Sequence, residues 1–135
     1  MSARLLVLDA SAAVYLTAMD GTWSGFARYV VHAPPLMWSE TLSGLCKAAH
    51  RGEMSGAELD RALGRLEALP VVASAADSIH RRDALDIARK LRWAKTYDAE
   101  YVALAKTLGC PVLTTDQRLQ RGAGRVIDIV GPSDV

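Results

Sequence analysis

Two strand-like runs that each end in an aspartate constrain the fold of this chain most strongly. Residues 4–9 read Arg-Leu-Leu-Val-Leu-Asp, and residues 111–116 read Pro-Val-Leu-Thr-Thr-Asp. The first run is continuously apolar rather than alternating, which is typical of a strand buried on both faces of a parallel sheet. Because the carboxyl ends of parallel strands meet at one edge of the sheet, Asp9 and Asp116 are expected to lie near each other.

Helical and strand-like segments alternate along the rest of the chain. Ser55 with Glu58 three residues later forms a capping-box pattern, and Pro70 ends the helix that follows. Gly109 closes the last long helix. The other expected helices span 10–19, 22–31, 37–50, 75–92 and 98–108, with a helical turn at 117–121, and the further strands span 71–72, 112–115 and 126–129. This alternation predicts an α/β fold with a parallel, doubly wound sheet covered by helices on both faces.

The composition indicates one folded domain over residues 1–135. Half of its 135 residues are apolar, so the chain is large enough for a hydrophobic core and too apolar to be disordered. The net charge of +1 gives no global signal of a polyanionic partner. The apolar run 5–8 is too short for a signal peptide or a membrane span. Cys46 and Cys110 are expected to be small buried hydrophobes, which suits a reducing cytoplasm.

Two further acids are expected at the sheet edge that carries Asp9 and Asp116. A helix over 98–108 and a strand over 112–116 are each about 16 Å long and run antiparallel, so Asp98 should lie level with Asp116. Glu40 is expected in the first turn of its helix, and helix N-termini collect at the same edge. The sequence therefore predicts that four carboxylates from four segments converge.

A cluster of four carboxylates predicts a metal site, because like charges a few ångströms apart disfavour joint ionisation. Mg²⁺ prefers oxygen ligands and accepts phosphate oxygens, and a metal held this way assists phosphodiester hydrolysis. Each acid also has a structural interpretation. Asp98 could be a helix N-cap, Asp116 could start a turn, and Glu40 could be an ordinary first-turn acid.

Four segments together resemble PIN domains, and more narrowly the VapC toxins of bacterial toxin–antitoxin modules. They cover residues 5–12, 38–42, 96–105 and 112–119, and their order and spacing match the family across essentially the whole chain. The resemblance implies a three-layer sandwich with a five-stranded parallel sheet flanked by helices. It also implies a Mg²⁺- or Mn²⁺-dependent endoribonuclease that forms a homodimer and is neutralised by a VapB-type antitoxin.

The resemblance also assigns residues. The acids of the family fall on Asp9, Glu40, Asp98 and Asp116. Ser11 falls where the family often has a small hydroxyl residue near the metal, and Thr114 or Thr115 is implied to support Asp116. Some PIN nucleases carry a further acid just after the last one, whereas Gln117 and Arg118 follow Asp116 here. One metal is therefore expected, and a second is not supported.

An RNA substrate requires local positive charge. Residues 81–95 hold six basic residues against two acidic ones and lead directly to Asp98. We expect RNA to approach along Arg92, Lys95 and Arg118, although a solvated helix face would have the same composition. Trp93 is expected to pack in the core or at a subunit interface rather than to stack on a base.

Other functions fit the residues less well. An aspartyl-nucleophile phosphatase needs a second acid two residues after Asp9, where Ser11 stands. A phospho-receiver needs paired acids after its first strand, which are absent. A catalytically inactive PIN domain that binds RNA or protein stays open as the alternative, although the presence of all four acids argues against it.

Overall fold

The computed structural model describes residues 4–74 and 77–134 and contains a five-stranded parallel sheet in the order β3-β2-β1-β4-β5. The strands are β1 Arg4–Leu8, β2 Tyr29–Ala33, β3 Val71–Ala73, β4 Val112–Leu113 and β5 Ile129–Val130. The α-helices are α1 Ala10–Ala18, α2 Leu36–His50, α3 Gly56–Ala68, α4 Ser78–Leu91, α5 Tyr97–Leu108 and α6 Gln117–Ala123, and a 3₁₀ helix spans Ser24–Ala27. The predicted five-stranded parallel sheet is confirmed.

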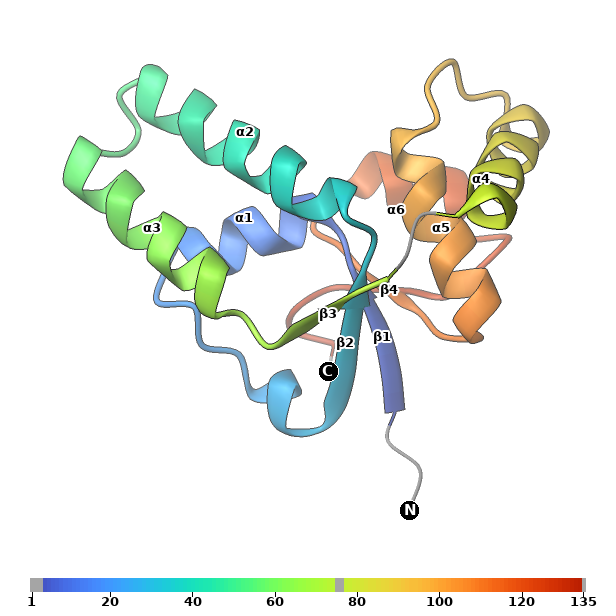
Figure 1. Ribbon diagram of the computed structural model, residues 1–135, viewed down its shortest axis with the longest axis horizontal. Helices are drawn as coiled ribbons and strands as arrows, with labels where there is room; N and C mark the ends of the chain where they lie inside the picture. The colour runs from blue at the N-terminus through green and yellow to red at the C-terminus, as the bar shows by residue number, and fades with distance from the viewer. Residues whose placement is uncertain (1–3, 75–76, 135) are drawn as a thin grey trace.

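Helices cover the sheet in two groups, which completes the expected three-layer sandwich. Helices α1, α2 and α3 pack against one another, and α2 and α3 form an antiparallel pair (Figure 1). Helix α4 packs on α5, which in turn packs on β1. Among the helices of the described residues, none combines the length and apolar character needed to cross a membrane.

Strand β1 is the point at which the order of strand addition changes direction, although all five strands are parallel. After β1 the chain builds β2 and β3 on one side, and it then crosses to add β4 and β5 on the other. Val7 pairs with Val112 and Leu8 with Leu113, so β1 and β4 end at the same level. Ligands of open α/β sheets bind at such a switch point, beyond the carboxyl ends of the strands. Asp9 and Asp116 follow these two strands directly.

The predicted helix 22–31 is wrong in its second half. After the short 3₁₀ helix, residues 29–33 form β2, which pairs with β1 from Arg4↔Tyr29 to Val7↔His32 and with β3 on its other side. Its sequence, Tyr-Val-Val-His-Ala, is rich in the aromatic and β-branched residues that suit a central strand. Ladder pairing on two sides outweighs the helical spacing of the apolar residues in this segment.

Several smaller predictions are confirmed and others need correction. The Ser55–Glu58 capping box is present, and Gly109 caps α5 in the left-handed conformation. The helix predicted at 75–92 begins at Ser78 in the described chain, and residues 75–76 lie outside it. The strand predicted at 126–129 is shifted to Ile129–Val130. Cys46 is exposed rather than buried, and Cys110 is half-buried.

Candidate active site

Asp9 is the most deeply buried carboxylate at the switch point, with 4% of its surface exposed. It follows β1 and caps α1, because its Oδ1 accepts a hydrogen bond of 2.9 Å from the backbone N–H of Ala12. Ser11 Oγ donates to the same oxygen at 2.8 Å, and Thr114 Oγ1 donates to Oδ2. Burial nevertheless outweighs these three bonds and raises the pKa of Asp9 to about 6.

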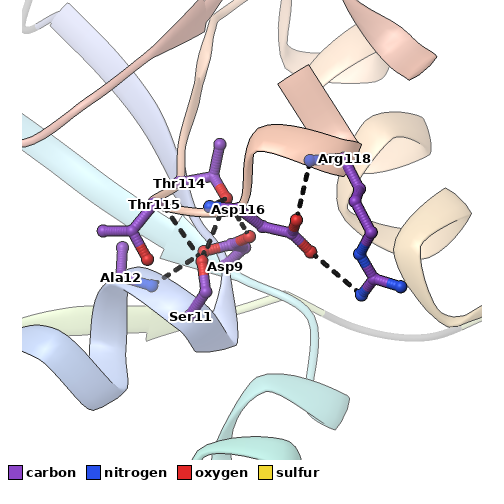
Figure 2. Close-up of polar contacts among 7 residues, drawn as sticks. All are labelled: Asp9, Ser11, Ala12, Thr114, Thr115, Asp116 and Arg118. Carbon is purple, nitrogen blue, oxygen red and sulfur yellow. Dashed lines mark hydrogen bonds and ion pairs between the residues drawn. The ribbon is translucent and has the colours of Figure 1, made fainter. Parts of the chain in front are cut away.

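Two hydroxyl groups join the end of β1 to the turn after β4 (Figure 2). While each donates its proton to Asp9, Ser11 Oγ accepts the N–H of Thr115 and Thr114 Oγ1 accepts the N–H of Asp116, both at 3.0 Å. The hydroxyls therefore link the carboxylate of Asp9 to the backbone that carries Asp116. Ser11 and Thr114 lie where the sequence placed supporting residues, while Thr115 contributes through its backbone.

Asp116 caps the short helix α6. Its Oδ1 accepts the backbone N–H of Arg118 at 2.9 Å, and the Arg118 guanidinium lies 3.4 Å from Oδ2. The turn that the sequence allowed as an alternative interpretation of Asp116 is thus present. It does not compete with a role in a site, because Asp9 and Asp116 line the same cleft.

Asp98 and Glu40 reach the same region from α5 and α2. Asp98 is the second residue of α5 and Thr96 is the N-cap, so the N-cap interpretation of Asp98 is wrong. Burial raises the pKa of Asp98, and the nearby carboxylate of Asp116 adds to the shift. Asp98 therefore lies level with Asp116, as the helix and strand lengths predicted.

Glu40 is not in the first turn of its helix, which corrects the prediction. Helix α2 begins at Leu36, so Glu40 is its fifth residue, and helix-dipole stabilisation does not explain it. Its Oε1 accepts a hydrogen bond of 2.5 Å from the hydroxyl of Tyr101. Burial raises the pKa of Glu40, and the carboxylates of Asp98 and Glu100 raise it further.

All four predicted acids line one cleft of about 260 Å³, called the acid cleft below. Its lining residues are Asp9, Ala10, Ser11, Val14, Glu40, Gly44, Asp98, Tyr101, Asp116 and Arg118. Four carboxylates against one guanidinium make it strongly electronegative, although it lies in a chain whose net charge is only +1.

The donor chemistry of the acid cleft fits a hard divalent cation. Its ligand candidates are all carboxylate oxygens, and burial raises the pKa of Asp9, Glu40 and Asp98, a strain that a cation would relieve. Within the described residues, no three or more His, Cys, Asp or Glu side chains lie close enough together to hold a metal ion by themselves. Mg²⁺ does not require one, since it keeps several waters and uses one or two carboxylates together with substrate phosphates.

The three residues predicted to meet RNA also lie together. Arg92, Lys95 and Arg118 line a second cleft of about 470 Å³, called the side cleft below. The whole lining of the side cleft is Glu40, Arg92, Trp93, Ala94, Lys95, Tyr97, Asp98 and Arg118. Because Glu40, Asp98 and Arg118 belong to both clefts, the two are continuous.

Tyr101 has a polar role that sequence reasoning missed. The residue is 1% exposed and belongs to the core, yet its hydroxyl donates a hydrogen bond to Glu40. Glu100 was also missed, although it acts on the pKa of Glu40 and lies 3.6 Å from His80 Nε2. A residue three positions after Asp98 shares its helix face, so the spacing of Tyr101 was the available signal.

Comparison with known proteins places this geometry in context. A family model described as PIN domain matches residues 6–125. Ribonuclease VapC3 of Mycobacterium tuberculosis (strain ATCC 25618 / H37Rv) is 36% identical over 126 residues, covering 86% of this chain and 85% of the relative. Ribonuclease VapC12 of the same strain is 33% identical over 130 residues, covering 93% and 97%.

A solved structure shows the same fold. The crystal structure of PAE2754 from Pyrobaculum aerophilum aligns with a TM-score of 0.73 and 24% sequence identity. The alignment covers 99% of this chain and 94% of that one, so it includes both sides of the switch point.

Proposed function

This chain belongs to the PIN-domain family, and from that membership we propose that it is a metal-dependent endoribonuclease, the toxin of a type II toxin–antitoxin module. The observation that carries the proposal is the convergence of four carboxylates from four separate segments on one cleft. Relatives named ribonucleases that are about one-third identical over most of the chain support the same activity. We propose that residues 1–135 act as a single nuclease domain.

Asp9, Asp98, Asp116 and Glu40 are the residues that would hold Mg²⁺ or Mn²⁺. When bound, such a cation lowers the pKa of a water molecule and offsets the charge that builds up on the phosphodiester. Gln117 and Arg118 stand where some PIN nucleases carry a further acid, so the proposal is limited to one metal.

Neighbouring side chains orient the carboxylates of Asp9 and Glu40, and the hydroxyl of Tyr101 stays protonated. Ser11 and Thr114 aim the carboxylate of Asp9 by donating to both of its oxygens. Burial and the adjacent Glu40 raise the pKa of Tyr101, so its hydroxyl keeps its proton and remains a donor. Tyr101 thereby fixes Glu40 Oε1 at the lining of the acid cleft.

Cleavage of RNA with and without metal tests this proposal. The purified protein is incubated with total RNA in Mg²⁺, in Mn²⁺ and in EDTA, and the cleavage ends are sequenced. We expect cleavage with either metal and none in EDTA. Cleavage that persists in EDTA would overturn the metal mechanism, while no cleavage under any condition would favour the inactive RNA- or protein-binding module.

The toxin role adds partners to the proposal. We propose a homodimer and neutralisation by a VapB-type antitoxin whose C-terminal segment covers the active-site groove. Expression of the chain should then arrest growth unless the antitoxin is supplied. Harmless expression of an enzyme that cleaves RNA in vitro would contradict the toxin role without touching the nuclease activity.

A further inference from the structure

The side cleft lies next to the acid cleft but has a different chemical character. It is formed mainly by the segment between α4 and α5, and Arg118 of α6 completes it. Three basic side chains, Arg92, Lys95 and Arg118, face two carboxylates that the acid cleft shares. A volume of about 470 Å³ lies within the range of small-ligand sites.

Two aromatic residues of the side cleft differ in their freedom. Trp93 is half-buried and packs against the hydrophobic core, and a side chain at Gly122 would lie 3.0 Å from its ring. Its ring is therefore a fixed wall. Tyr97 is the first residue of α5 and is 52% exposed, which leaves its ring available to a ligand. Exposed aromatic rings are the surfaces on which unpaired bases stack.

Arg92 occupies a backbone position that normally selects glycine. It caps α4 in the left-handed conformation, with φ 58° and ψ 38°, and its N–H bonds to Ala88 O and Arg89 O. Among the described residues, it is the sole non-glycine residue with positive φ. An arginine is disfavoured here relative to glycine. Arginine at position 92 therefore lowers the stability of the fold relative to glycine, and it places a cation in the lining of the side cleft.

Three polar side chains of the side cleft are available to a ligand. In the part of the chain that the structure describes, Arg92, Lys95 and Tyr97 have no side-chain hydrogen bond or ion pair. All three are exposed. They offer two cations for phosphate oxygens and one ring for a base, and phosphate and base are two of the three parts of a nucleotide.

We infer that the side cleft is a nucleotide subsite, in which Tyr97 stacks on an unpaired base while Arg92 and Lys95 bind its phosphate, directly beside the phosphodiester that enters the acid cleft. The inference rests on the proposed ribonuclease function and adds the residues that would hold an unpaired nucleotide beside the acid cleft. Bases in a duplex are stacked on their neighbours and cannot present a free face to Tyr97.

Binding measurements in a cleavage-dead background test the subsite. The Asp9→Asn protein is titrated with a fluorescently labelled single-stranded RNA of mixed sequence, and with the same RNA annealed to its complement. We expect tighter binding of the single strand. Tyr97→Ala should weaken that binding about tenfold, whereas Tyr97→Phe, which keeps the ring, should stay within about twofold of the parent.

The Arg92→Gly variant distinguishes an effect on RNA binding from an effect on stability. Removing one phosphate contact should reduce the slope of log affinity against log salt by about 0.7, while the melting temperature stays the same or rises, because glycine suits the left-handed position. Tyr97→Ala should leave that salt slope unchanged. Lys106→Gln, an exposed lysine near the other end of α5, is the matched control and should change neither affinity nor slope.

The outcomes distinguish the subsite from the function. If the wild-type protein cleaves RNA but Tyr97→Ala and Arg92→Gly bind like the parent, the subsite is refuted and the nuclease stands. Equal losses in Tyr97→Phe and Tyr97→Ala would refute stacking. If the wild-type protein neither binds nor cleaves RNA, the proposed function fails and the subsite fails with it.

Discussion

The acid cleft and the side cleft share three residues but are built in opposite ways. Asp9 in the acid cleft is 4% exposed and is held by hydrogen bonds from Ser11 in α1 and from Thr114 after β4. In the side cleft, Arg92, Lys95 and Tyr97 are exposed and come from one connecting segment. The carboxylate of Asp9 is thus held in place before any ligand arrives, whereas the exposed side chains of Arg92, Lys95 and Tyr97 can adjust to a ligand. Rigidity suits chemistry and adjustability suits binding of varied sequences.

The largest effect should come from the residue that defines the acid cleft. Asp9→Asn removes a charge from the metal ligand set, and we expect cleavage to fall by more than about 100-fold, since even loss of residues that merely orient ligands costs 10–100-fold. Relief of repulsion should leave the fold intact. Cleavage rates and circular dichroism spectra measure the two effects.

Asp77→Asn is the matched control for Asp9→Asn. Asp77 also caps a helix, α4, by accepting a backbone N–H, but it does not line either cleft. We expect full activity from this variant. If both variants lost activity equally, helix capping rather than metal binding would account for the loss in Asp9→Asn.

The second prediction concerns pH and the metal-free protein. Burial raises the pKa of Asp9 to about 6 from its ordinary 3.8, so the folded state binds this proton more tightly than the unfolded state does. The free energy of unfolding therefore falls as the pH rises from about 4 to 6, by up to about 3 kcal/mol in all. Above that window, Asp9 no longer changes the free energy of unfolding with pH.

Urea denaturation in EDTA across that window measures the effect. The free energy of unfolding of the wild-type protein relative to Asp9→Asn should fall by about this amount between the two ends, because the amide does not titrate. Added Mg²⁺ at neutral pH should recover much of the loss by stabilising the ionised form. Parallel pH curves for the two proteins would contradict the burial of an unfavourable charge.

Loss of the Thr114 hydroxyl, which links Asp9 to the backbone of Asp116, should reduce activity less than loss of Asp9 does. Thr114→Val removes the donor to Asp9 Oδ2 and the acceptor of the Asp116 N–H without changing the side-chain shape. We expect activity to fall 10–100-fold while the protein stays folded. Thr17→Val, which removes a buried hydroxyl bonded only within α1, should keep full activity. Normal cleavage by Thr114→Val would show that the acids need no such support.

The sequence predicted the acid cleft better than it predicted the segments around it. Asp9, Asp98 and Asp116 could be placed because strand ends and helix lengths follow from fixed rises per residue. Glu40 was expected in the first turn but is the fifth residue of α2, because α2 begins at Leu36, one residue earlier than expected. The first residue of α2 depends on how Pro34 and Pro35 leave β2.

Segment 22–31 and Tyr101 show what local sequence cannot reveal. Strand β2 forms because β1 and β3 pair with it, and neither partner is visible from the segment itself. The bond between Tyr101 and Glu40 joins residues 61 positions apart. Likewise, the left-handed backbone of Arg92 has no signature in a sequence that lacks glycine at that position. Strand β2 and the Tyr101–Glu40 bond therefore depend on tertiary partners that lie outside the local sequence.

Arg118 belongs to both clefts, and its substitution should weaken RNA binding and strengthen Mg²⁺ binding. Its guanidinium is 83% exposed, pairs with Asp116 and lowers the pKa of Asp98. Arg118→Gln removes a phosphate partner, so single-stranded RNA should bind about threefold more weakly at physiological salt, with a salt slope reduced by about 0.7.

The same substitution should tighten Mg²⁺ binding, because the guanidinium competes with a cation for the carboxylate of Asp116. Calorimetric titration with Mg²⁺ in the absence of RNA measures this second effect, and Arg121→Gln, in the last turn of α6, is the control. If Arg118→Gln weakened both ligands, Arg118 would act by holding Asp116 in place, and the two clefts would form one binding unit. Opposite signs would mean that Arg118 contributes to RNA binding and competes with the cation for the carboxylate of Asp116.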